Sequence, residues 1–252
     1  MNIFARGFVN MQNFKSTVKQ FLSLCGIFLT RNQRYDYLSQ KVYRKLLRTG
    51  SNCVDIGCHK GEVLRELLKL APNGIHYGFE PIPGLFNQYM LGQFPDNCRL
   101  FNLGLSSEKR EKSFHFVRSN PAYSGFRKRS LRAGETVEII QVQTDCLDNI
   151  LSVGYCPDLI KIDVEGAELE VLKGSLRTLT TCSPAILFEH GKGASDHYGT
   201  TPGAIFQLLC RELGYSIFTL QRFLQEDSPL NEAEFSSHYE SGTEYYFIAL
   251  KQ

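Results

Sequence analysis

The sequence lacks a marked excess of either charge, because its 252 residues have a formal net charge of only +2. This balance predicts no strong attraction to nucleic acid. The eight cysteines form no Cys-x-x-Cys pair and no paired Cys/His set, so we expect no structural zinc site. Several cysteines (Cys53, Cys182, Cys210) lie in apolar stretches. We interpret the cysteines as reduced thiols in a reducing compartment, the cytoplasm.

Apolar stretches long enough to cross a membrane are also missing near the start of the chain. Residues 21–29 are apolar but too short to span a bilayer, and no small-residue cleavage site follows them. We interpret residues 1–50 as a helical extension with two helices between residues 14 and 48, packed on the domain that follows. Contact with a membrane surface, or an export signal, is the alternative.

A third glycine is missing from the loop after the first predicted strand. This strand, residues 53–56, leads into Asp55-x-Gly57-x-x-x-Gly61, whereas dinucleotide folds use Gly-x-Gly-x-x-Gly to hold a pyrophosphate. The spacing therefore argues against a nicotinamide-dependent oxidoreductase and suits a nucleoside ligand without phosphate. A second strand then delivers Glu80, whose carboxylate can accept both hydrogen bonds of a ribose diol. The commonest ligand of this kind is S-adenosylmethionine.

Apolar strands and amphipathic helices alternate through residues 51–252, which we interpret as one domain. The predicted strands are 53–56, 75–79, 99–103, 159–164 and 185–188, with helices at 62–70, 82–93, 167–179 and 202–213. Two last strands, 216–220 and 245–250, have no helical pattern between them. The chain therefore predicts a Rossmann-like α/β fold: seven mostly parallel strands, one of them antiparallel, with helices on both faces.

Ligands of such sheets bind at the carboxyl ends of the strands. We expect Gly57, Gly61 and Glu80 to contact the cofactor there, and Asp55 to orient the loop and meet a methionine ammonium. After the third strand, Asn102 or Ser106 is expected to border the adenine. Asp163 and Glu165 end the fourth strand two residues apart, so both should project to the same side, and we expect Asp163 to contact the cofactor as well.

Several of these segments resemble the FkbM-type S-adenosylmethionine-dependent methyltransferases. The resemblance rests on Val54-Asp55-Ile56-Gly57 with Gly61, Phe79-Glu80-Pro81, Leu147-Asp148, the run Lys161-Ile162-Asp163-Val164-Glu165-Gly166-Ala167-Glu168, and Leu172-Lys173-Gly174. It covers residues 51–190, and the run at 161–168 is its most specific part. It implies S-adenosylmethionine as cofactor and O-methylation of a sugar or another small molecule.

Methyl transfer to a hydroxyl benefits from a base, because hydroxyls have a high pKa. We expect His190, at the end of the fifth strand, to be this base, with Asp163 and Glu165 as further catalytic candidates. His59 in the glycine loop is a weaker one. We assign no metal site, but a divalent metal held by Asp163, Glu165 and Glu189 is the alternative means of activating the hydroxyl.

Residues 106–135 are rich in lysine and arginine and interrupt the alternation, with paired strands expected at 114–117 and 137–143. We interpret this segment as a solvated loop or as a lid that closes on an anionic or sugar acceptor. The predicted partner is therefore a small-molecule or saccharide hydroxyl, possibly anionic, and not nucleic acid. Two alternatives stay open: a nitrogen acceptor, and a non-catalytic nucleoside-binding domain.

Overall fold

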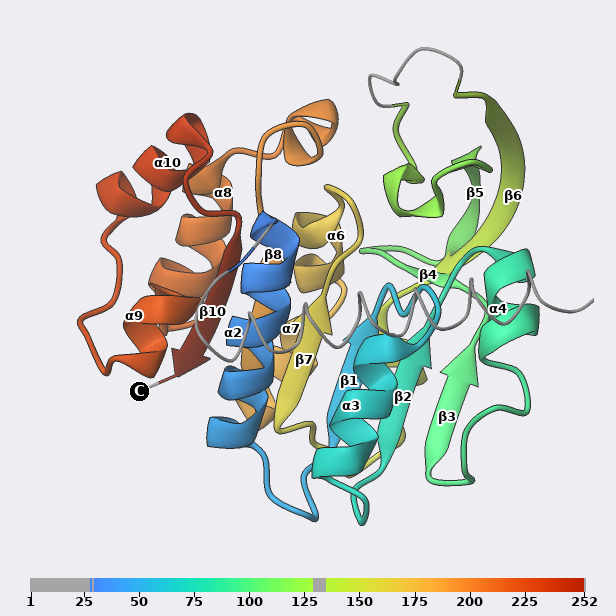
Figure 1. Cartoon of the computed structure of the whole chain (residues 1–252), viewed down its shortest axis with the longest axis horizontal. Helices are drawn as coiled ribbons and strands as arrows, with labels where there is room; N and C mark the ends of the chain where they lie inside the picture. Colours follow the sequence, from blue (N-terminus) through green and yellow to red (C-terminus); the bar gives the residue numbers. More distant parts are fainter. Residues whose placement is uncertain (1–27, 29, 129–134, 252) are drawn as a thin grey trace, which may run out of the picture.

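A seven-stranded sheet forms the centre of the computed structural model, which describes residues 28, 30–128 and 135–251 (Figure 1). The strand order is β3-β2-β1-β7-β8-β10-β9, and only β10 runs antiparallel to its neighbours. The strands are β1 (Cys53–Ile56), β2 (His76–Phe79), β3 (Cys98–Phe101), β7 (Leu159–Ile162), β8 (Ala185–Glu189), β9 (Tyr215–Thr219) and β10 (Tyr246–Lys251). The predicted fold class is confirmed.

Helices cover both faces of the sheet, because successive residues of its buried strands point to opposite sides. The helices are α2 (Arg31–Leu46), α3 (Glu62–Leu70), α4 (Pro83–Tyr89), α5 (Leu147–Ile150), α6 (Glu168–Lys173), α7 (Leu176–Cys182), α8 (Pro202–Phe206), α9 (Leu220–Leu224) and α10 (Glu232–Ser241). Val54, Ile160 and Ile186 pack with α6, α7, α8 and α10. Cys53 and Leu187 pack with α2, α3 and α9 on the other face.

A second, smaller sheet rises beside the carboxyl ends of β1, β2 and β3. It consists of β4 (Gly104–Leu105), β5 (Arg110–Val117) and β6 (Val137–Asp145), in the order β4-β6-β5. The predicted pairing of residues 114–117 with 137–143 is confirmed, since β5 and β6 are antiparallel with Phe114 opposite Ile140. A short 3-10 turn, Pro121–Tyr123, follows β5 and lies close to the ends of the main strands.

Two helical expectations were wrong. No helix was expected between the last two strands, yet α9 and α10 lie there. The start of α10 has a capping box, in which Asn231 and Glu234 each accept a backbone N–H of the other. Its apolar face is only Phe235 and Tyr239, too little to stand out as a periodic pattern. The single helix expected at 167–179 is instead α6 and α7, broken at Gly174, where a β-carbon would lie 2.0 Å from the Ser106 carbonyl oxygen.

Helix α2 is the second of the two helices predicted before the sheet, and the first lies outside the described residues. Tyr35, Val42 and Tyr43 of α2 are buried against the sheet and α3. This helix therefore belongs to the same core as the strands. Residues 21–27 and 29 of the apolar stretch are also outside the described part. Among the described residues, no helix is both long and apolar enough to cross a membrane.

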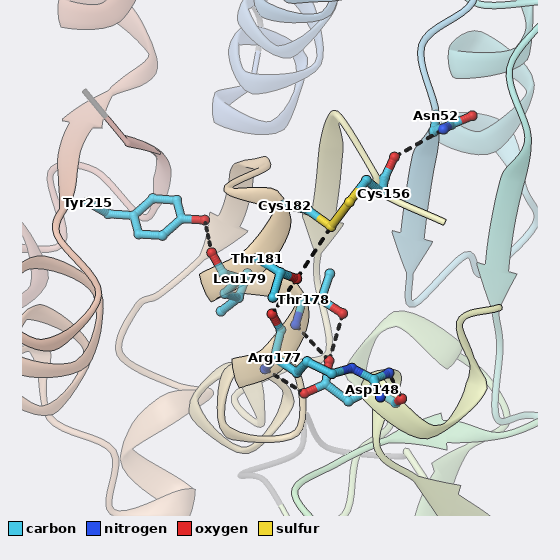
Figure 2. The surroundings of a disulfide bond; sticks show 9 residues. All are labelled: Asn52, Asp148, Cys156, Arg177, Thr178, Leu179, Thr181, Cys182 and Tyr215. Carbon is cyan, nitrogen blue, oxygen red and sulfur yellow. Dashed lines mark hydrogen bonds between the residues drawn. A yellow bond between two sulfur atoms is a disulfide. The ribbon is translucent and has the colours of Figure 1, made fainter. Parts of the chain in front are cut away.

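The expectation that all cysteines are reduced thiols is wrong for Cys156 and Cys182, which form a disulfide (Figure 2). It joins the segment before β7 to the end of α7, at the amino ends of the central strands β7 and β8 and so opposite the carboxyl ends where the site described below lies. The spacing of the cysteines in the sequence did not indicate the pair. The two residues are 26 positions apart and come together only in the folded chain. Disulfides are typical of oxidising compartments, which is at odds with the reducing compartment that we expected.

Candidate functional site

A cavity of about 240 Å³ lies at the carboxyl ends of β1, β2 and β7, where the sheet order reverses. We call it the smaller cavity. Its wall contains the glycine loop at Gly57, the carboxylate of Glu80 and the end of β7 at Asp163. Flat or branched apolar side chains form the rest of one side: Ile82, Leu103, Leu105, Phe114 and Phe126.

Gly57 lines the smaller cavity, and no other residue fits its position. Its φ is +82°, and a β-carbon there would lie 1.9 Å from the Asp163 carbonyl oxygen. Gly61 has φ +72° and is the N-cap residue directly before α3, but it does not line the cavity. A β-carbon at Gly61 would collide with the Phe94 ring at 2.8 Å. The two predicted glycines therefore differ in role: Gly57 forms part of the cavity wall, and Gly61 allows the start of α3 to pack against Phe94.

Glu80 lies where the sequence predicted it, at the end of β2 and in the cavity wall. It is 3% exposed, and its two oxygens accept the backbone N–H groups of Ile82 (2.8 Å) and His59 (2.7 Å). Burial raises the pKa of Glu80 from its ordinary 4.5 to about 7, although the two N–H groups oppose the rise. Each oxygen keeps a lone pair for a further donor such as a ribose hydroxyl.

Three predicted contact residues lie outside the lining of the smaller cavity. Asp55 is fully buried within β1. The exposed Asn102 donates through Nδ2 to the Glu80 carbonyl oxygen at 2.8 Å, so it supports the end of β2. Ser106 is buried, and its hydroxyl accepts from Lys112 at 2.8 Å. These three side chains therefore lie outside the cavity wall and contact the protein. After the third strand, Leu103 and Leu105 line the cavity instead of Asn102 and Ser106.

A second cavity of about 830 Å³, the larger cavity, adjoins the first. The two share part of their walls, with Glu62, Val63, Ala122, Lys161, Asp163 and Glu165 lining both. Helix α2 and the start of β10 close its far side. Five tyrosines line it: Tyr35, Tyr43, Tyr123, Tyr245 and Tyr246. A compound in the larger cavity would therefore meet one in the smaller cavity at Asp163.

Lys161 is the main residue that sequence reasoning missed. It is 5% exposed in β7, and its ammonium lies 3.4 Å from Asp55 Oδ1 and 3.5 Å from Asp163 Oδ2. Burial alone would lower the pKa of Lys161, but these two carboxylates raise it above its ordinary value. A lysine in the middle of an apolar strand, Leu-Ile-Lys-Ile, was the available signal, because buried charges require partners.

Asp163 is held as a carboxylate at the junction of the cavities. Burial favours its neutral form, but the Lys161 ammonium and the Tyr246 hydroxyl, which donates to Oδ2, together lower the pKa of Asp163. Glu189 also hydrogen-bonds Asp163, and burial and the Asp163 charge raise the pKa of Glu189 well above its ordinary value. The pair therefore favours one proton, carried by Glu189.

Asp163, Glu165 and Glu189 meet as the sequence predicted for the metal alternative. Carboxylate oxygens from the three residues all lie within 4.8 Å of one another. Glu165 has φ +57° in a tight turn after β7, and Glu168 accepts the backbone N–H groups of Val164 and Gly166 in that turn. The same arrangement can hold a proton between carboxylates or place oxygen ligands around a cation.

His190 lies on the opposite side of the sheet from these carboxylates. It is fully buried and stacks on Phe235 and Tyr239, and its Nδ1 is 3.0 Å from the Ser195 hydroxyl. Burial lowers the pKa of His190 to about 4. His190 lines none of the three described cavities. An imidazole without access to the cavities cannot take a proton from an acceptor, so the expected base role is corrected.

The alternation of side chains along β8 explains this outcome. Lys161 pairs with Leu187 in the register of β7 and β8, so the extension of both strands puts Asp163 beside Glu189. His190 follows Glu189 directly and therefore points the other way, with Phe188. The polar pair at the end of the strand was recognised from the sequence, but the member facing the cavity is the glutamate.

The basic segment after β4 covers the smaller cavity. Phe114, Ser124 and Phe126 from this segment form part of the wall, and Ala122 lines both the smaller and the larger cavity. Four of its described basic side chains pair with nearby acids: Lys109 with Asp145 at 3.3 Å, Arg110 and Lys112 with Glu108 at 2.8 and 3.4 Å, and Arg118 with Glu138. Residues 129–134, including Arg129 and Arg132, are outside the described part.

Only Lys161 among the described lysines and arginines lines the smaller cavity, and its charge is already balanced by carboxylates. A pyrophosphate would therefore meet no lysine or arginine of the described residues there that is not already paired. A nucleoside with an uncharged or cationic tail fits this lining: Glu80 for its hydroxyls, apolar side chains for its base and Asp163 for positive charge. The residues therefore suit S-adenosylmethionine better than a dinucleotide.

Comparison with known proteins agrees with this reading of the residues. The sequence model of the methyltransferase FkbM domain matches residues 55–217. The 2-O-methyltransferase NoeI of Sinorhizobium fredii is 29% identical over 160 residues, covering 56% of this chain and 66% of NoeI, just under two thirds of its length.

Solved structures show weaker likenesses. The methyltransferase FkbM of Methylobacillus flagellatus is 14% identical, with a TM-score of 0.43 over 82% of this chain and 47% of that one. The plantazolicin methyltransferase BpumL, in complex with a desmethyl-plantazolicin analogue and SAH, is 12% identical, with a TM-score of 0.46 over 99% and 95% of the two chains. At these values the likenesses carry no information about substrate.

Proposed function

Because the chain belongs to the FkbM methyltransferase family, we propose that it transfers a methyl group from S-adenosylmethionine to a hydroxyl oxygen of a small molecule or saccharide. The observation that carries the proposal is the meeting of two cavities at Asp163. One has a nucleoside-type lining with Glu80, and the other is large, polar and rich in tyrosine. The 2-O-methyltransferase activity in the name of NoeI supports the oxygen acceptor.

In this proposal Glu80 binds the ribose hydroxyls, and the apolar group around Leu103 and Phe126 encloses the adenine. Gly57 brings the backbone of the glycine loop to the methionine part. When bound, S-adenosylmethionine supplies an electrophilic methyl group that passes from its sulfonium sulfur to the acceptor. The protein's own contribution is then mainly positioning, since the donor is already activated.

Asp163 is our proposed proton acceptor in place of His190. It faces both cavities and is held as a carboxylate by Lys161 and Tyr246. A carboxylate of low pKa suffices, because the acceptor hydroxyl becomes strongly acidic as its oxygen forms the new bond to carbon. Glu189, which is itself protonated and hydrogen-bonds Asp163, helps to hold that carboxylate in place. Glu165 stays a further catalytic candidate at the same wall.

The larger cavity supports an uncharged polyhydroxyl acceptor better than an anionic one. Six carboxyl residues line it (Asp36, Glu62, Glu66, Asp163, Glu165, Glu189) against three cations (Arg31, Lys161, Lys192). Each cation already has an acceptor: Arg31 donates to the Thr243 carbonyl, Lys161 pairs with two carboxylates, and Lys192 pairs with Glu240. Tyrosines and carboxylates can bind a sugar ring through its hydroxyls and apolar face.

A thermal-shift comparison tests the cofactor part. S-adenosylmethionine and S-adenosylhomocysteine should raise the melting temperature while NAD does not, because a ligand that binds only the native state stabilises it by mass action. Stabilisation by NAD alone would refute the proposal.

Transfer of a labelled methyl group to a panel of hydroxyl-bearing and amine-bearing acceptors tests the reaction. Label recovered as a base-stable methyl ether supports oxygen transfer, and label on nitrogen supports the first alternative. Tight S-adenosylhomocysteine binding without transfer to any acceptor would favour the non-catalytic alternative.

A further inference from the structure

Lys161 is a buried cation in the central strand of the sheet, and its position needs an explanation. A charged group removed from water costs several kcal/mol unless it is well paired. Lys161 is 5% exposed and belongs to β7, whose other residues (Leu159, Ile160 and Ile162) are buried and apolar. An apolar residue there would fill the strand at less cost, so the ammonium must be retained for what it contacts.

The ammonium of Lys161 is balanced by oxygens of the protein. Its Nζ donates a hydrogen bond to the Gly57 carbonyl at 3.2 Å and forms ion pairs with Asp55 Oδ1 at 3.4 Å and Asp163 Oδ2 at 3.5 Å. Within the described part of the chain, neither carboxylate oxygen of Asp55 has a hydrogen-bond partner, so the Lys161 charge compensates Asp55 as an ion pair. The lysine side chain also reaches the walls of both cavities.

Joining the strands is not what requires this cation. β1 and β7 are already paired by their parallel ladder, in which Asp55 lies opposite Lys161. Backbone hydrogen bonds continue just beyond the strand ends, from Gly57 N–H to the Phe79 carbonyl and from Asp163 N–H to the Ile56 carbonyl, at 3.0 Å each. These bonds do not involve the Gly57 carbonyl oxygen or the Asp163 carboxylate. Gly57 and Asp163 both line the smaller cavity. Lys161 is the side chain that connects them.

We propose that Lys161 is a positioning residue of the cofactor site, whose ammonium fixes the Gly57 carbonyl and the Asp163 carboxylate in one arrangement before the cofactor binds. The inference rests on the proposed function. Without this cation, Asp163 would lose its ion-pair partner and the glycine loop one of its hydrogen bonds. The cofactor would then have to order both on binding, which lowers affinity.

The test compares two variants that share the same background. Asp55→Leu removes the fully buried carboxylate but leaves Lys161 with Gly57 and Asp163. Asp55→Leu/Lys161→Met replaces the whole buried Asp55–Lys161 pair with apolar side chains, a change that proteins often tolerate, so neither member of this pair is left buried without the other. The affinity for S-adenosylhomocysteine is measured by calorimetry, below the melting temperature of both proteins.

The double variant should bind S-adenosylhomocysteine at least about fivefold more weakly than Asp55→Leu, in line with couplings within one ion-pair network. Leu209→Ala, a fully buried leucine that lines none of the described cavities, is the control for lost stability. It should lower the melting temperature without changing this affinity.

A difference smaller than fivefold between the two Asp55 variants overturns the inference, since Lys161 is then only structural. An equal loss in Leu209→Ala overturns it as well, because the affinity then follows stability alone. If the double variant does not fold, Lys161 is needed for the core, and the inference also fails. Absence of binding to the unaltered protein would instead refute the proposed function on which the inference rests.

Discussion

The raised pKa of Glu80 makes a quantitative prediction for the Glu80→Gln variant. In the native protein this carboxyl binds its proton up to about pH 7, whereas its ordinary pKa is 4.5. The difference corresponds to about 3 kcal/mol of folding free energy. Because the native pKa is the higher one, this contribution is fully present below pH 4.5 and is lost as the pH rises through about 7. Glutamine cannot titrate, so the variant loses this pH dependence.

The Glu80→Gln substitution also lowers the folding stability in a way that does not depend on pH. Both Glu80 oxygens accept backbone N–H groups, from His59 and Ile82. Glutamine keeps only one oxygen as an acceptor and puts an NH2 donor in place of the other, so one buried N–H loses its partner at a cost of about 1–3 kcal/mol. We therefore expect the variant to be less stable than the parent near pH 5. It should approach or exceed the parent near pH 8.

Urea unfolding of the parent and of Glu80→Gln between pH 5 and pH 8 measures the difference in their unfolding free energies. The difference in unfolding free energy should shift by about 2–3 kcal/mol in favour of Glu80→Gln across the range. Glu168, whose pKa is also raised to about 7, is unchanged in both proteins and cancels in the comparison. A difference that stays constant within about 0.5 kcal/mol would refute the reasoning. The affinity of the parent for S-adenosylhomocysteine should rise over the same interval, as the carboxylate forms, and the variant should show no such rise.

Three further predictions concern other parts of the molecule. Replacing Cys156 and Cys182 with serine should lower the unfolding free energy by about 3.5 kcal/mol, the value for a loop of this length. Alkylation of the denatured parent without a reductant should label two cysteines fewer than alkylation after reduction, and equal labelling would contradict the disulfide. Phe126→Ala should weaken S-adenosylhomocysteine binding by about 1–3 kcal/mol in calorimetry, whereas unchanged affinity would place the adenine elsewhere. With an acceptor in hand, Asp163→Asn should slow transfer by about 10²–10⁴-fold and His190→Asn by much less; the reverse order of rates would restore His190 as the base.

Local signals in the sequence were sufficient for most of the fold. The alternation of apolar strands and amphipathic helices predicted the seven-stranded sheet, and the Gly57 and Glu80 spacing predicted the smaller cavity. The helices after β9 were missed because α10 has only Phe235 and Tyr239 buried, so its start was marked by a cap and not by periodicity.

The sequence by itself determined which segments are strands, where the backbone must turn at Gly57, and that an acid follows β2. These properties depend on neighbours a few residues away. Only the tertiary structure decided which distant side chains meet: Lys161 between Asp55 and Asp163, Glu189 in the cavity with His190 behind the sheet, and Cys156 joined to Cys182. Such meetings depend on strand order, on register and on which face of a strand each residue occupies, because one step along a strand turns a side chain to the opposite side.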